Sequence, residues 1–185
     1  GPLGLSLGDE TVPAWQGWRD QLAGWKKAGA PLAFYNYVEW EHPDVTLFWF
    51  FNTADVLRTL HRQYNCRMLL GETENNILIS TLLYHVVART VWDVDTDYRE
   101  VIRDICGVFY GPVAEEMIGY NLRLDEAIRR STAWQEADWR PNNHVDIPIP
   151  VLEEGRQVLE QVAAKVADDP ALSQRVAFAR FGHAY

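Results

Sequence analysis

Hydrophobic positions along the chain form two short apolar runs separated and followed by longer helical patterns. The first run covers residues 32–40 and the second covers residues 66–70, and polar or turn-forming residues bound both. Between them, residues 52–65 repeat apolar side chains at helical spacing, and a longer apolar helical pattern follows at 77–91. Strand, helix, strand, helix is the order of a parallel βα repeat. The sequence therefore predicts a helix-rich α/β fold.

Further helical patterns lie on both sides of this repeat. Residues 14–28 predict an amphipathic helix capped by Gly29, with one inward stripe of Trp15, Trp18, Leu22 and Trp25. Towards the C-terminus the pattern predicts helices over 97–110, 113–130, 151–168 and 171–181. Residues 131–150 change in composition and are rich in proline, asparagine and tryptophan, which indicates a long loop.

These changes in pattern suggest three segments. Residues 1–13 combine an irregular lead-in with Gly1-Pro2-Leu3-Gly4, which is typical of the remnant of a cleaved affinity tag. Residues 14–95 hold the predicted strands, and residues 96–185 form a C-terminal helical region. A length of 185 residues suits one domain, or one domain with a small appendage.

Composition and charge exclude several classes of function. The net charge of −9 argues against nonspecific nucleic-acid binding and against docking on an anionic membrane, which both depend on clustered cations. No apolar run approaches the roughly 18 residues of a membrane-spanning helix. Cys66 and Cys106 are too few and too far apart for a disulfide framework, so we expect buried free thiols. No metal site or cofactor motif is visible, and nothing indicates a cellular compartment.

Candidate chemistry gathers where the second apolar run ends. Glu72 and Glu74 follow Gly71, at the place where parallel βα units carry their functional loops. In an extended segment their Cα atoms would lie roughly 7 Å apart on one face, which suits a pair of acid and base catalysts. The alternative is that both carboxylates cap the helix that follows.

The first predicted strand has an unusual polar aromatic face. Alternation places Tyr35, Tyr37 and Glu39 on one side of it, and Glu39 could converge with Glu72 or Glu74 across a cleft. A face of this kind suits a strand that lines a ligand cavity, and aromatic rings stack on sugars. A solvated acid at the end of a strand is the alternative for Glu39.

Several motifs resemble one known family. The order Leu82-Leu83-Tyr84, Ala88-Arg89, Val91-Trp92-Asp93 and Phe109-Tyr110-Gly111-Pro112-Val113-Ala114, with Tyr120, is similar to the C-terminal half of the DUF4838 family, which is allied to α-glucuronidase-like glycoside hydrolases. The resemblance covers roughly residues 15–130 and implies a (β/α)8 barrel whose last two βα units this chain supplies, followed by a C-terminal helical extension. It implies Glu72 and Glu74 as catalytic residues, with sugar contacts from Tyr35, Tyr37, Glu39, Trp40 and Asn75.

The expected function is thus that of a carbohydrate-binding part of a glycoside-hydrolase-like protein. Because the resemblance leaves six strands of the barrel unaccounted for, we expect this part alone to be inactive. We also expect it to form a homo-oligomer, to cover its edges with helices or to belong to a longer protein. The alternative is a non-catalytic helical module that binds another protein or itself.

Overall fold

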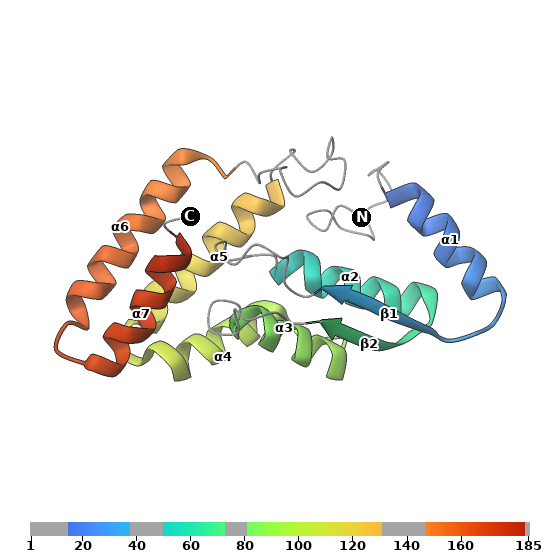
Figure 1. Cartoon of the computed structure of the whole chain (residues 1–185), viewed down its shortest axis with the longest axis horizontal. Coiled ribbons are helices and arrows are strands. Elements are labelled where there is room, and N and C mark those ends of the chain that lie inside the picture. Colours follow the sequence, from blue (N-terminus) through green and yellow to red (C-terminus); the bar gives the residue numbers. More distant parts are fainter. Residues whose placement is uncertain (1–14, 38–49, 73–80, 131–146, 184–185) are drawn as a thin grey trace.

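The computed structural model describes residues 15–37, 50–72, 81–130 and 147–183 (Figure 1). The elements run in the order α1 (Gln16–Lys27), β1 (Leu32–Tyr37), α2 (Phe50–Tyr64), β2 (Cys66–Glu72), α3 (Thr81–Trp92), α4 (Tyr98–Tyr110), α5 (Ala114–Arg130), α6 (Ile149–Lys165) and α7 (Pro170–His183), with a 3₁₀ turn at Gly111–Val113. None of the helices in these ranges is both long and apolar enough to cross a membrane.

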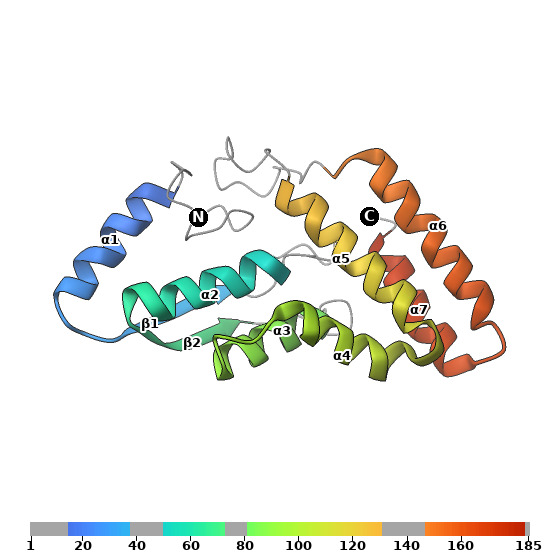
Figure 2. The same ribbon diagram turned by 180° about the vertical axis from the view of Figure 1, so that it is seen from behind.

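The two strands form a parallel sheet, as the sequence predicted. Leu32 pairs with Cys66, and after one irregularity the register continues to Tyr37, which pairs with Glu72. Helix α2 connects the strands and lies on one face of the sheet, as the front and back views agree (Figures 1 and 2). This βα arrangement confirms the predicted fold class at the level of a helix-rich α/β fold, whereas no further barrel units are seen among the described residues.

Among the described residues, helices cover only one face of the sheet. Phe34 and Cys66 pack with α2 in a small cluster that also contains Val56, Leu60 and Tyr64. On the other face, Tyr35, Met68 and Leu70 are 50%, 62% and 61% exposed. The alternation predicted for the first strand is therefore correct for Phe34 and Tyr35, which lie on opposite faces.

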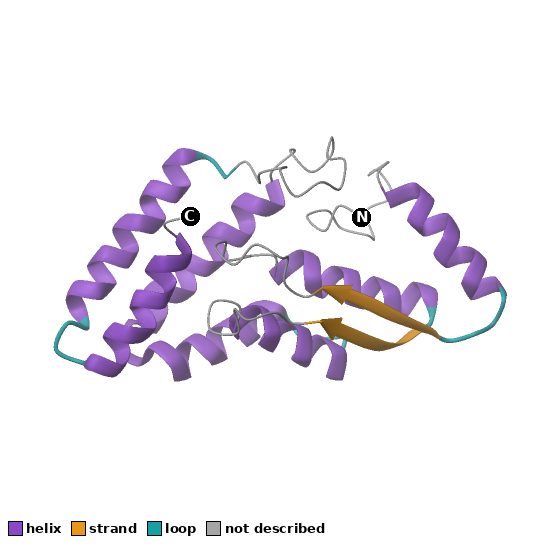
Figure 3. Cartoon of the chain, in the orientation of Figure 1, coloured by secondary structure: helices purple, strands orange, loops and turns teal. Residues whose placement is uncertain are grey.

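Helix α1 corrects part of the sequence prediction. Trp15 is buried and Leu22 is partly buried in the cluster beneath α2, but Trp18 and Trp25 are 43% and 60% exposed. The physical reason is that α1 lies at the edge of the molecule, so its wide apolar stripe meets only a narrow surface (Figure 3). Its predicted end is confirmed, because Gly29 takes the positive φ of 79° expected after a helix.

A second and larger core lies among the helices α2 to α7. Its centre is made of side chains that are almost wholly enclosed, among them Phe50, Leu83, Ile102, Met117, Leu124 and Val176. Helix α2 contributes to both clusters, because Phe50 and Ala54 face the helical core while Leu60 faces the sheet. Helix α2 therefore joins the strands to the helical region.

The boundaries of the later helices follow local chemistry. Asp97 caps α4, and its side chain accepts a hydrogen bond of 2.9 Å from the backbone N–H of Arg99. Gly111, at a φ of 50°, ends α4, and Pro112 begins the short turn before α5. The division of the chain into three segments, and the expectation of a homo-oligomer, stay predictions.

Candidate functional site

The carboxyl edge of the sheet brings together two of the predicted site residues. Tyr37 and Glu72 are register partners at the last position of β1 and β2, so their Cα atoms lie opposite one another. Parallel strands point their carboxyl ends to the same edge, which is where loops in βα folds carry binding groups. The backbone therefore places Tyr37 and Glu72 next to each other, as the sequence predicted.

The remaining predicted site residues are divided between the sheet face and segments that the structure does not describe. Tyr35 is half exposed, on the face of the sheet opposite to Phe34 and α2. Glu39, Trp40, Glu74 and Asn75 lie outside the described residues. The proposed convergence of Glu39 with Glu72 or Glu74, and the capping alternative for both glutamates, thus stay predictions.

Two of the described histidines contact backbone carbonyl groups, and both cysteines are buried. The ring of His61 lies 3.2 Å from the carbonyl oxygen of Cys66 and that of His85 lies 2.8 Å from the carbonyl oxygen of Thr81. Both thiols are free and buried, as expected from the sequence. In the described ranges no three His, Cys, Asp or Glu side chains gather in a way that would hold a metal ion.

A buried carboxylate joins three helices of the larger core. Asp125 of α5 accepts hydrogen bonds from the backbone N–H of Phe51 at 3.0 Å and from the hydroxyl of Tyr98 at 3.1 Å. Burial raises the pKa of Asp125 to about 6, although these hydrogen bonds oppose the shift. The same burial raises the pKa of Tyr98 well above its ordinary value. Each carboxylate oxygen of Asp125 accepts one hydrogen bond inside the core. Asp125 therefore connects α5 to α2 and to α4 and has a structural role.

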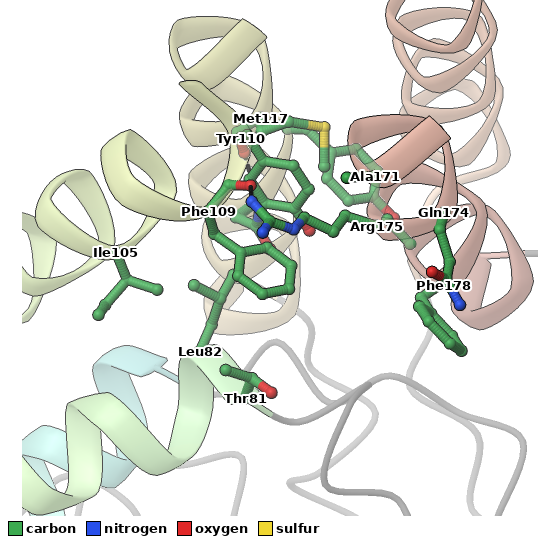
Figure 4. Close-up of a pocket in the computed structure, with 13 residues that line it drawn as sticks. Thr81, Leu82, Ile105, Phe109, Tyr110, Met117, Ala171, Gln174, Arg175 and Phe178 are labelled. Atoms are coloured by element: carbon green, nitrogen blue, oxygen red, sulfur yellow. Dashed lines mark hydrogen bonds between the residues drawn. The ribbon is translucent and has the colours of Figure 1, made fainter. Parts of the chain in front are cut away.

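A cavity of about 370 Å³ lies among α3, α4, α5 and α7. Figure 4 shows its walls, which include Leu82, Phe109, Tyr110, Met117, Arg175 and Phe178. Arg175 extends from α7, donates a hydrogen bond of 2.6 Å to the carbonyl oxygen of Phe109, and lies 4.8 Å from the centre of the Phe109 ring. Burial raises the pKa of Tyr110, and the positive charge of Arg175 partly offsets that rise.

No pattern in the sequence pointed to this cavity. Arg175 stands in an apolar helical pattern, where an arginine usually lies on the solvated face of the helix. Its position becomes significant only when α7 packs against α4, which a pattern within one helix does not determine. An arginine on the Ala- and Phe-rich helix 171–181 was the one available signal.

Comparison with known proteins points to a different relationship from the one the motifs suggested. The chain is 33% identical over 117 residues to a probable transaldolase of Streptococcus agalactiae serotype V, covering 62% of this chain and 45% of that protein. It is 35% identical over 68 residues to a probable transaldolase 2 of Listeria monocytogenes, covering 37% of this chain and 28% of that protein. The matched part thus spans less than half the length of these relatives. No family model matches the chain, and no solved structure matches it significantly.

These matches overturn the resemblance to the DUF4838 family and the function drawn from it. The predicted glycoside hydrolase activity is wrong, because the relatives that match are named as probable transaldolases and not as glycoside hydrolases. The physical reason for the error lies in the motifs themselves. The segments from Leu82 to Asp93 and from Phe109 to Ala114 form a core helix and a helix end with a glycine–proline turn. Such features arise in many folds, since packing and capping alone require them.

Proposed function

We propose that this chain is part of a transferase related to the transaldolases and that it binds phosphorylated sugars at the carboxyl edge of its sheet. The observation that carries the proposal is the 117-residue match, at 33% identity, to a probable transaldolase. The pairing of Tyr37 with Glu72 at that edge supports the location. A phenol and a carboxylate offer a donor and acceptors to sugar hydroxyl groups.

The positions of the lysines indicate whether this chain could supply the reactive amine of such a transferase. Transfer of an aldol fragment breaks and forms a carbon–carbon bond beside a carbonyl, and enzymes often activate such carbonyls by forming a Schiff base with a desolvated lysine. The sequence has three lysines, Lys26, Lys27 and Lys165. All three lie in the last turn of a helix, are exposed, and are remote from the carboxyl ends of the strands.

We therefore propose that this chain supplies binding groups and that a Schiff-base amine, where the reaction uses one, comes from outside it. Lys165 is further occupied by an ion pair of 2.5 Å with Glu116. A Schiff-base lysine is instead desolvated and directed at the carbonyl carbon of its substrate. Lys26 and Lys27, at the end of α1, are exposed to solvent rather than desolvated.

The test is a titration of the chain with a ketose phosphate and with the same ketose lacking phosphate, followed by amide NMR. We expect the phosphorylated sugar to bind in the millimolar range or tighter and to shift the amides around Tyr37 and Glu72. Glu72→Gln and Tyr37→Phe should weaken this binding about tenfold or less, because each removes one hydrogen-bonding group. Glu115→Gln, at an exposed position in the first turn of α5, is the matched control and should bind as the wild type does.

A second measurement examines the lysines. Incubation with a ketose phosphate and borohydride, followed by mass spectrometry, should leave the chain without a covalent adduct. A stoichiometric adduct on any of the three lysines would show that the chain carries the reacting amine itself. Absence of sugar binding at every concentration up to the solubility limit would overturn the proposal as a whole.

A further inference from the structure

The cavity among α3, α4, α5 and α7 brings apolar side chains together with the guanidinium of Arg175, for which no ion pair is found among the described residues. Leu82, Met117 and Phe178 are among the residues that line it, and no aspartate or glutamate is found among its described lining residues. Its volume of about 370 Å³ is more than twice the roughly 150 Å³ of a cavity that accommodates benzene. It also falls in the range of about 300–1,000 Å³ that small-molecule sites occupy. There is room for a ligand with a ring and a short chain.

Arg175 is held so that half of its guanidinium remains available. Nη1 donates to the carbonyl oxygen of Phe109 at 2.6 Å, and the guanidinium carbon lies 4.8 Å from the centre of the Phe109 ring. These two contacts fix the plane of the group. In the described part of the chain, Nε and Nη2 have no hydrogen-bond partner and no carboxylate forms an ion pair with Arg175.

The two remaining nitrogen atoms form a matched pair of donors. Nε–H and Nη2–H point in parallel from one edge of the guanidinium, which is the geometry that binds both oxygens of a carboxylate. A partly buried arginine without an acidic partner leaves a positive charge in a region of reduced dielectric, so an anion that enters gains more there than it would at the open surface. By contrast, Arg156 on α6 is exposed and forms ion pairs with Glu153 and Glu160.

We propose that this cavity binds a small organic carboxylate with an apolar or aromatic body, and that Arg175 binds its carboxylate group. The ring or chain of the ligand would lie against Leu82, Met117 and Phe178. This site is separate from the carboxyl edge of the sheet and does not depend on the function proposed there. Its ligand differs in chemistry from a sugar phosphate, because much of the wall is apolar, with Leu82, Ile105, Phe109, Met117 and Phe178 among the lining residues.

The test compares 3-phenylpropanoate with 3-phenylpropanamide by calorimetry or ligand-observed NMR on the whole chain. The acid should bind at least about tenfold more tightly than the amide, because only the acid forms the charged pair with Arg175. Arg175→Gln should abolish this preference. Arg175→Lys keeps the charge but loses the paired donors, so the preference should become smaller without disappearing.

Two further variants separate the site from general effects on the fold. Arg180→Gln changes an exposed arginine on the same helix and should leave the binding of the acid unchanged. Ala171→Phe places a ring at an exposed lining position and should block the acid without removing the charge. The proposal is overturned if the acid and the amide bind equally, if neither binds, or if Arg180→Gln lowers binding as much as Arg175→Gln does.

Discussion

The hydroxyl of Tyr98 donates a 3.1 Å hydrogen bond to the carboxylate of Asp125, and both residues are buried. The other oxygen of the same carboxylate accepts from the backbone N–H of Phe51 at 3.0 Å. One side chain on α5 thus binds the first residues of α4 and of α2. Because burial raises the pKa of this carboxyl from 3.8 to about 6, the junction makes the stability of the protein depend on pH.

We predict that Asp125→Asn changes the pH dependence of unfolding between about pH 4 and pH 6. In that window the native state holds a proton on Asp125 that the unfolded state has already lost. Raising the pH through it should therefore cost the wild type about 3 kcal/mol of stability from this group alone. Urea unfolding at several pH values should show that Asp125→Asn lacks this decline.

The control for that measurement is Asp168→Asn, an exposed change that should leave the profile of the wild type intact. Asp125→Ala should instead destabilise the protein at every pH by about 2–4 kcal/mol, because it leaves buried donors without an acceptor. A profile of Asp125→Asn that is parallel to that of the wild type would contradict the prediction.

A second prediction concerns the contact between α6 and α7. A Cβ atom at Gly155 would lie 2.7 Å from Cε1 of His183 and 3.2 Å from the ring of Tyr120. His183 cannot move away freely, since its Nδ1 lies 3.1 Å from the Tyr120 hydroxyl and its Nε2 lies 2.8 Å from the carbonyl oxygen of Leu152. Gly155→Ala should therefore destabilise the protein by about 1–3 kcal/mol, measured by thermal or urea unfolding.

Gly119 provides the matched comparison for this change. It lies within α5 and is exposed, and a Cβ atom added there would meet no other atom within 4 Å. Alanine there should stabilise the protein by up to about 1 kcal/mol, because alanine favours the helix over glycine. Equal effects of Gly155→Ala and Gly119→Ala would mean that the close contact at Gly155 is unimportant.

A third prediction concerns Thr90, whose side chain is fully buried in α3. Its hydroxyl oxygen finds no hydrogen-bond partner in the part of the chain that the structure describes. Replacing it with valine, which has nearly the same shape, should raise stability by about 1 kcal/mol or more. Ser173→Ala should do the opposite, because the Ser173 hydroxyl donates a 2.7 Å bond to the carbonyl oxygen of Val166. A destabilised Thr90→Val variant would show that the threonine hydroxyl has a partner such as a water molecule in the 50 Å³ cavity that Thr90 lines.

A fourth prediction uses the thiols as reporters of unfolding. Cys106 is wholly buried in α4, and burial raises its pKa to about 12. Its thiolate is therefore scarce at neutral pH, and reagents that attack thiolates should modify it only when the helical core opens. The measurement is the rate of modification at increasing urea, with peptide mass spectrometry to separate Cys106 from Cys66. Fast modification of Cys106 in native buffer would contradict the buried position.

The sequence predicted local structure well where one rule determined it. The cap at Gly29, the break between the helices 97–110 and 113–130, and the parallel strands all followed from residue chemistry or from the order of elements. The exposure of Trp25 did not, because burial of an amphipathic face depends on how much surface its neighbours offer. The position of Arg175 in the cavity was not predicted for the same reason, because its contact with Phe109 forms only when α7 packs against α4.

The candidate site was predictable only in its outline. Pairing of Tyr37 with Glu72 follows from two strands running the same way, and the structure places them opposite one another. The chemical role was wrongly predicted, because helix ends and core helices such as Thr81–Trp92 carry no information about the reaction. The match over 117 residues, at 33% identity, is to a probable transaldolase and not to a glycoside hydrolase.

The crossover between β1 and β2 sets the order in which the protein can fold. Leu32 pairs with Cys66, so the first contact of the sheet joins residues 34 positions apart, and the whole of α2 lies between them. A hairpin can close through its own turn, but these strands can meet only after α2 has doubled back along them. The helical half of the chain contains mostly contacts between successive helices, which form quickly. We therefore expect the sheet to gain hydrogen-exchange protection late in refolding, together with α2 and after the helices that follow it.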